Sequence, residues 1–194
     1  MEQFWFYIKL GLDHVLDFSA YDHILFLAAL GAPYTFKSWK KVLVLATVFT
    51  VAHCLSLAAS VFEIFTIDSG LIEFLIPVTI FATAAYNIYK SWRSNEETKG
   101  VVPILATTFF GFVHGFGFSN YFKMLMSGEE NKLGPLFGFA TGIEISQVLI
   151  IMSVLCLAYL SQTVFKLKKQ LFIIVLSLII FGITIPMLVK TFPW

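Results

Sequence analysis

Charged side chains are scarce in this sequence. Only 13% of its 194 residues are Asp, Glu, Lys or Arg, whereas 58% are hydrophobic and the mean hydropathy is +0.85. A soluble domain carries about 25% charge, so the composition excludes an ordinary soluble protein. The net charge of +1 is too small to indicate a nucleic-acid partner. The partner that the composition itself predicts is the lipid bilayer.

Cysteine is rare as well. Cys54 and Cys156 form no CxxC pair and lie in apolar runs, so we expect free, buried thiols rather than a thiolate metal site. The sequence also lacks an HExxH motif and a nucleophile elbow, which are signatures of zinc proteases and serine hydrolases. The N-terminal MEQFWFYIKL has no basic region and no small-residue cleavage site, so we expect the mature protein to begin at Met1.

Long apolar runs dominate the chain instead. A run of about 18 to 20 apolar residues crosses a hydrocarbon core roughly 30 Å thick, and lipid requires such a span to be helical. We therefore predict an all-α fold, a polytopic transmembrane bundle forming a single domain over residues 1–194. About six spans are expected within residues 18–188, at 18–34, 39–62, 71–89, 101–125, 135–165 and 171–188.

Residues 1–17 have a different pattern. Lys9, Asp13 and Asp17 fall four apart on one helical face, and apolar side chains occupy the other positions. This pattern is typical of an amphipathic helix that lies in the membrane interface. The alternative is that the segment joins the first span as one long, bent helix.

Loop charges predict the orientation. The first, third and fifth loops carry most of the basic residues, whereas acidic residues dominate the second and fourth. The residues involved are Lys37, Lys40, Lys41, Glu63, Asp68, Lys90, Arg93, Glu96, Glu97, Lys99, Glu129, Glu130, Lys132, Lys166, Lys168 and Lys169. Basic loops face the cytoplasm, so both termini are expected to be extracytoplasmic.

The few ionisable side chains in and beside the spans concentrate at one depth. They include every histidine of the chain, and the set is His14, Asp22, His23, His53, Glu73, His114 and Glu144. The predicted topology puts nearly all of them between the outer surface and the midplane. Ionisable groups are costly in lipid, so a cluster of them indicates function. Imidazole and carboxylate groups are good ligands for Zn, Ni or Co, so we predict metal or proton chemistry here.

Other polar residues are candidates for a supporting shell. Gln147 follows Glu144 by one turn, and Glu73 and Asn87 lie on the third span. Hydrogen-bonded groups of this kind orient metal ligands. Two of them have simpler interpretations, because Glu73 sits at a helix N-terminus, where a carboxylate is favourable, and Asn87 is expected to bridge helices.

Glycines recur every four residues on two spans. Gly111 and Gly115 flank His114, and Gly134, Gly138 and Gly142 precede Glu144. This spacing lets helices approach closely. Close packing could therefore bring His114 and Glu144 within ligand distance, although plain helix packing accounts for the same pattern.

Five segments carry a family resemblance. DHVLDFSAYDHILFLAAL, FTVAHCLSLAAS, IEFLIPVTIFATAAYN, FGFVHGFGFSN and FATGIEISQ, in this order, resemble the HupE/UreJ family of bacterial membrane proteins. The resemblance implies a nickel or cobalt permease of the bacterial inner membrane. The residues to which it assigns metal handling are His23, Asp22, His53, His114 and Glu144, with His14 as a further ligand. His14 precedes Asp22 by eight residues, whereas the spacing in many members is five.

Three functions remain open. The first is a permease that binds a divalent metal near the midplane and releases it inward. The second is an intramembrane zinc-dependent hydrolase facing the extracytoplasmic side, with an open water position on the metal, Glu144 as general base and Ser56 orienting the substrate. The third is a non-catalytic module with a structural metal and a protein partner, and homo-oligomers are compatible with any of these.

Overall fold

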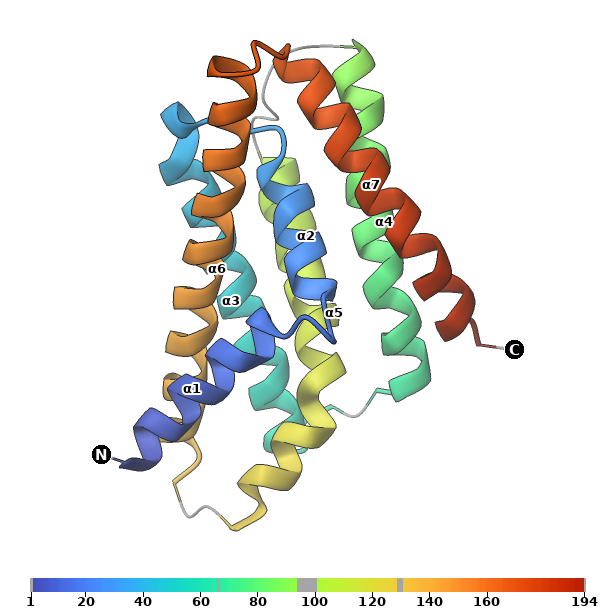
Figure 1. The fold of residues 1–194 in the computed structure, drawn as a ribbon. Coiled ribbons are helices and arrows are strands. Elements are labelled where there is room, and N and C mark those ends of the chain that lie inside the picture. Colours follow the sequence, from blue (N-terminus) through green and yellow to red (C-terminus); the bar gives the residue numbers. More distant parts are fainter. Residues whose placement is uncertain (1, 66, 94–100, 129–130, 194) are drawn as a thin grey trace.

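The computed structural model describes residues 2–65, 67–93, 101–128 and 131–193, and every regular element in these ranges is helical (Figure 1). The α-helices are α1 (Glu2–Leu16), α2 (Asp22–Gly31), α3 (Trp39–Val61), α4 (Ser69–Arg93), α5 (Val101–Leu125), α6 (Leu133–Thr163) and α7 (Lys169–Thr191). Short 3-10 turns, Phe36–Ser38 and Met126–Gly128, precede α3 and follow α5. The loop charges Glu96, Glu97, Lys99, Glu129 and Glu130 lie outside the described residues.

The all-α prediction is confirmed, and α3 to α7 coincide with the predicted second to sixth spans to within about four residues at each end. Four of these helices, α3 with its preceding turn, α4, α6 and α7, are long and apolar enough to cross a membrane. Their most apolar windows have mean hydropathies between 1.6 and 2.8. The chain is therefore a helical membrane protein, and its full number of spans and its orientation stay predictions.

The predicted first span is not one continuous helix. Helix α2 has only ten residues, which is about 15 Å of length against a hydrocarbon core of about 30 Å. Upstream, the chain turns at Asp17, whose carboxylate accepts a hydrogen bond from the Ser19 backbone N–H at 2.7 Å. Residues 17–21 therefore separate α1 from α2, so the expected helix over 18–34 is wrong at both ends, as is the long bent helix that joined it to residues 1–17.

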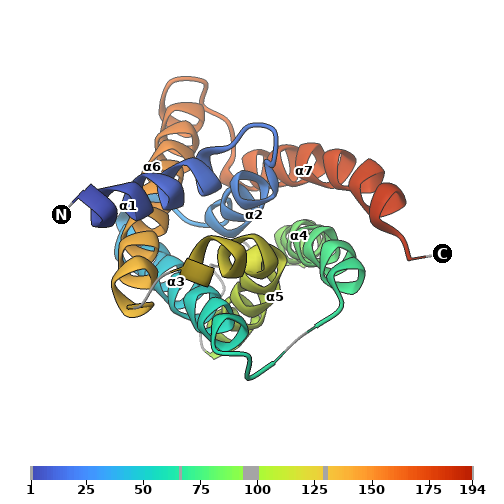
Figure 2. The same cartoon turned by 90° about the horizontal axis from the view of Figure 1, so that it is seen from below.

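Helix α1 packs against α6. It buries Tyr7, Ile8, Gly11 and Val15, and glycines on both helices let the two backbones touch. A Cβ added at Gly142 of α6 would collide with the carbonyl oxygen of Ile8 and lie 3.0 Å from the Cα of Gly11. The buried face of α1 is thus its glycine-containing face, and Figure 2 shows the helix lying across α6.

The remaining helices form pairs around α2. Helix α3 packs along α5, α4 along α7, and α2 contacts both α4 and α6 (Figure 2). In Figure 1 the last turns of α2, α4 and α6 and the first turns of α3, α5 and α7 lie toward one end of the bundle, and both chain termini lie toward the other. Lys37, Lys40 and Lys166 lie on the segments at the first end, in agreement with the alternation predicted from loop charge.

Candidate metal centre

Four helices bring every histidine of the chain to one place in the interior. The ligand atoms form two overlapping groups, in each of which they lie within 4.8 Å of one another. One group is His14, His23 and His53, and the other is Asp22, His23 and His114. Because His23 belongs to both, these five residues make one continuous cluster at the junction of α1, α2, α3 and α5.

The break between α1 and α2 brings His14 close to Asp22 and His23. His14 lies in the last turn of α1, and Asp22 and His23 begin α2. The turn at residues 17–21 folds these two helix ends together, so the His14 and His23 rings lie 4.6 Å apart between centroids. The eight-residue separation of His14 and Asp22 therefore does not place them on one helical face; it is bridged by a non-helical turn.

Close packing of α3 against α5 brings His53 and His114 to the cluster. A Cβ added at Gly115 would collide with the Ser56 hydroxyl and the His53 carbonyl oxygen, and one at Gly111 would lie 2.7 Å from the Phe49 carbonyl oxygen. Helices α3 and α5 therefore touch at the level of His53 and His114. The ring of His23 lies between these two, 5.7 Å from that of His53 and 5.2 Å from that of His114.

Aromatic side chains enclose the cluster. Phe118 lies 4.0 Å from the His14 ring and stacks on Phe139, which also contacts His53. Phe26 and Phe49 contact His114, and Phe49 also contacts His23 and His53. These walls leave His23, His53 and His114 only 3%, 0% and 1% exposed. The imidazoles thus lie in an apolar, water-poor environment in which a polar atom needs a partner.

Hydrogen bonds assign the tautomers of two of the rings. His23 Nδ1 lies 3.2 Å from Asp22 Oδ1, so its N–H donates to that carboxylate and its Nε2 carries the lone pair. The Thr79 hydroxyl donates to the Ile76 carbonyl oxygen, so it accepts the Nε2–H of His114 at 3.3 Å. This leaves the lone pair of His114 on Nδ1. Carboxylate and hydroxyl partners of this kind orient histidines for metal ligation.

The nitrogens that carry these lone pairs have no protein partner. Among the described residues, buried side-chain atoms without a hydrogen bond include His14 Nε2, His23 Nε2, both ring nitrogens of His53 and His114 Nδ1. An unmatched buried polar atom costs roughly 1 to 3 kcal/mol. Four residues with such atoms in one cluster are a candidate donor set for a divalent transition-metal ion, with Asp22 as the nearby negative charge.

Glu144 does not join these groups. Its two carboxylate oxygens each accept a 2.6 Å hydrogen bond, from the hydroxyls of Thr47 and Thr50 on α3. The glycines that precede it explain the difference, because Gly138 and Gly142 face α1, not the helix that carries His114. The structure therefore does not bring His114 and Glu144 together in the way the glycine spacing suggested.

Among the described residues, none of the other polar candidates forms a hydrogen bond with a side chain of the cluster. Glu73 is exposed near the start of α4, and Asn87 donates to the Ala29 carbonyl oxygen at 2.7 Å, bridging α4 and α2 as expected. The Ser56 hydroxyl is committed to the carbonyl oxygen of His53. Gln147 is fully buried, and neither polar atom of its side chain has a partner among the described residues.

Three threonines were missed in the sequence. Thr79 supports His114, and Thr47 and Thr50 hold Glu144. A signal existed for two of them, because Thr79 precedes the selected Asn87 by eight residues and Thr50 precedes His53 by three. The thiols also differ in part from expectation, because both are free but Cys156 is exposed on the side of α6.

The family comparison agrees with this geometry. The family model described as HupE / UreJ protein matches residues 1–191, almost the entire chain. The chain belongs to the HupE/UreJ family. HupE/UreJ proteins are associated with nickel and cobalt transport. Neither the curated proteins nor the solved structures contain a match to the chain.

The donor types in the cluster of this HupE/UreJ chain indicate which metals they suit. Imidazole nitrogens with one carboxylate suit Ni, Co and Zn, whereas thiolate and thioether ligands select softer ions. Neither group of ligand atoms found among the described residues includes a cysteine. The donors present therefore fit the metals with which HupE/UreJ proteins are associated.

Proposed function

We propose that this protein is a permease for a divalent transition-metal ion, with nickel or cobalt as its cargo. The observation that supports it most is the convergence of His14, His23, His53 and His114, each with an unpartnered buried nitrogen. A resident structural metal would use the same donors, but the family association with transport favours a passing ion.

The proposal includes six spans with both termini outside the cytoplasm of a bacterial inner membrane. In it, α1 and α2 together make one broken span, because α2 alone is too short to cross, and this replaces the interfacial helix expected for residues 1–17. Helix α5 is the remaining span, with 25 residues, the same length as α4. Broken helices whose ends meet near the midplane are the usual place for substrate binding in secondary transporters.

The cluster then acts as the midway binding site. An ion arriving from the side of the chain termini exchanges its water for imidazole nitrogens, whose lone pairs Asp22 and Thr79 orient. Imidazoles must be neutral to bind, so protons compete with the ion and acidification weakens binding. Glu144 and Ser56, the base and orienting group of the hydrolase hypothesis, have their side chains committed elsewhere.

Flux measurements test the proposal. The purified full chain is reconstituted in liposomes containing a metal-sensitive dye, and Ni²⁺, Co²⁺ or Zn²⁺ is added outside. Uptake is expected for nickel or cobalt and should be lost in His53→Ala. Glu73→Gln is the matched control, because it neutralises an exposed ionisable side chain away from the cluster, and it should transport normally.

Two outcomes would contradict the permease. In one, the wild-type protein holds a metal tightly in equilibrium dialysis, yet no metal enters the liposomes. In the other, flux occurs but is the same in His53→Ala as in the wild type. The first outcome would favour a structural or catalytic role for the bound metal.

A further inference from the structure

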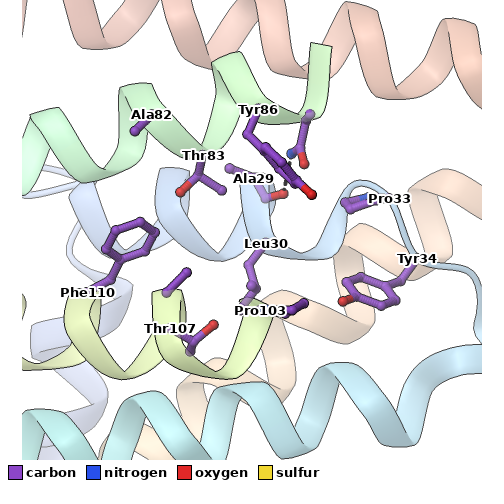
Figure 3. A pocket seen from close by; sticks show the side chains of 12 residues that line it. Ala29, Leu30, Pro33, Tyr34, Ala82, Thr83, Tyr86, Pro103, Thr107 and Phe110 are labelled. Carbon is purple, nitrogen blue, oxygen red and sulfur yellow. Dashed lines mark hydrogen bonds between the residues drawn. The ribbon is translucent and has the colours of Figure 1, made fainter. Parts of the chain in front are cut away.

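A cavity lies beside the histidine cluster. It lies toward the end of the bundle that carries Lys37, Lys40 and Lys166, the lysine-bearing end. It has a volume of about 180 Å³, is lined by α2, α4, α5 and the two residues Pro33 and Tyr34 that follow α2, and is partly open to the outside of the bundle. Figure 3 shows its side chains: Thr83 projects from α4, and Thr107 and Phe110 project from α5. One water molecule occupies about 30 Å³ in the liquid, so the cavity has room for several.

Polar contacts connect the cluster to this cavity along α4. Thr79, which accepts from His114, is followed one turn later by Thr83, whose hydroxyl donates to the Thr79 carbonyl oxygen at 2.8 Å. Asn87 lies another turn on, and both Thr83 and Asn87 line the cavity. Three oxygen-bearing side chains therefore follow one face of α4, beginning at a cluster histidine.

Helix α5 also extends from the cluster to the cavity, on the wall opposite α4. Phe110 lines the cavity one turn before His114, and Thr107, which is 1% exposed, lines it further along. The ring of Phe26 lies 5.4 Å from that of His114 and 5.5 Å from that of Phe110. The cluster and the cavity are thus neighbours, separated by a pair of aromatic rings.

The cavity also reaches the end of the bundle. Pro103, the third residue of α5, and Pro33, which lies beyond the last turn of α2, both line it. Small side chains of Ala29, Ala82 and Ala106 keep its middle open. It extends from beside the cluster to the helix ends near the predicted cytoplasmic surface.

We propose that this cavity is the exit chamber, filled with water, through which the cargo ion leaves the histidine cluster toward the lysine-bearing end. The inference rests on the proposed transport function and adds a route to it. The occupant is the divalent ion with part of its hydration shell. The hydroxyls of Thr83 and Thr107 and the carboxamide oxygen of Asn87 supply oxygen contacts along a wall that also includes Tyr34 and Tyr86.

Thiol accessibility tests the chamber without any need for transport. Ala106→Cys and Thr83→Cys are made separately in a full chain that also carries Cys54→Ala and Cys156→Ala. A charged, membrane-impermeant methanethiosulfonate reagent is applied to inside-out and right-side-out vesicles. Modification is expected only in the inside-out vesicles. If a lipid chain fills the cavity, only a membrane-soluble maleimide reacts, and that result overturns the proposal.

Filling the cavity tests its role in transport. Ala106→Phe places a ring in the space, whereas Leu105→Phe, one residue away and exposed on the outside of α5, is the matched control. Ala106→Phe is expected to reduce nickel flux at least about tenfold and leave equilibrium nickel binding intact, with Leu105→Phe unchanged in both. Normal flux in Ala106→Phe overturns the exit chamber.

The two proposals fail in different ways. If the wild-type chain binds nickel but moves none, the permease fails, and thiol accessibility still reports whether the cavity is open to water. If the wild-type chain transports while the cavity thiols stay unreactive with the charged reagent, the permease stands and the exit chamber is wrong.

Discussion

At the scale of single residues, hydrogen bonds decide which nitrogen each histidine presents. Asp22 takes the Nδ1–H of His23, and Thr79 takes the Nε2–H of His114. Both interactions leave the other nitrogen buried and unpartnered. In the proposed metal site, Asp22 and Thr79 therefore orient the ligands before an ion arrives, which lowers the cost of ordering the site on binding.

Thr79 offers the clearest residue-scale test. Thr79→Val keeps the side-chain shape but removes the hydroxyl that orients His114, so nickel affinity should fall by about 10- to 100-fold, the usual effect of losing such a partner. Isothermal titration measures this. Thr184→Val is the control, because the hydroxyl of this equally buried threonine bonds only to the backbone of its own helix α7 among the interactions described. Equal affinity in Thr79→Val and the wild type would contradict the role of Thr79.

The sequence predicted much of this site, because an ionisable residue in an apolar run is conspicuous. His14, Asp22, His23, His53 and His114 were selected, and their ligand atoms lie together. Glu144 was selected on the same grounds, but the direction in which a side chain points depends on helix rotation, which a uniformly apolar helix does not reveal. Thr79 was missed because threonine is inexpensive in lipid and its role depends on which side chain lies opposite.

At the scale of elements, glycines position the helices that carry the histidines. Gly142 lies against the Ile8 carbonyl oxygen and the Gly11 Cα, so the buried part of α1 has no room for a Cβ at this contact. Gly134, on the same helix, has nothing within 4 Å of an added Cβ. Alanine substitutions at these two positions therefore distinguish the effect of tight packing on stability from the effect of helix propensity.

Gly142→Ala should displace α1 and destabilise the protein by about 1 to 3 kcal/mol, the usual cost of overpacking. It should also weaken nickel binding, because His14 moves with α1. Gly134→Ala should leave the protein as stable as the wild type or slightly more so, since alanine favours the helix. Thermal unfolding in detergent compares the two, and an equal melting temperature for both variants would contradict the close α1–α6 contact.

The break at residues 17–21 could not be predicted from hydropathy. Phe18, Ala20 and Tyr21 are as compatible with a span as the apolar residues of α2, so hydropathy alone does not mark the turn at Asp17. The longer helices were predicted closely because each combines a full-length apolar run with polar loops at its ends. Length and apolarity predict elements well, whereas turns inside an apolar run depend on individual hydrogen bonds.

At the scale of the whole molecule, loop charge and fold give one consistent orientation. Helix ends near Lys37, Lys40 and Lys166 lie toward one end of the bundle, and the chain termini lie toward the other. In the proposed orientation, which places Lys37, Lys40 and Lys166 inside the cell, the cavity beside Thr107 lies on the cytoplasmic side of the cluster. This orientation makes the route through the protein run inward.

Sidedness can be measured in cells. In a chain with Cys54→Ala and Cys156→Ala, a single Asp68→Cys or Leu167→Cys places one thiol in the α3–α4 or the α6–α7 connection. An impermeant maleimide applied to intact spheroplasts should label Asp68→Cys and not Leu167→Cys. Labelling of Leu167→Cys alone would reverse the orientation and the proposed direction of transport.

The convergence of histidines from separate helices on one metal ion is tested most directly by X-ray absorption spectroscopy of the nickel-loaded full chain. The spectrum should show several imidazole ligands and no sulfur ligand, and most of the imidazole scattering should disappear in His23→Ala, because His23 belongs to both ligand groups. Nickel bound without imidazole, or an identical spectrum for His23→Ala, would contradict the account.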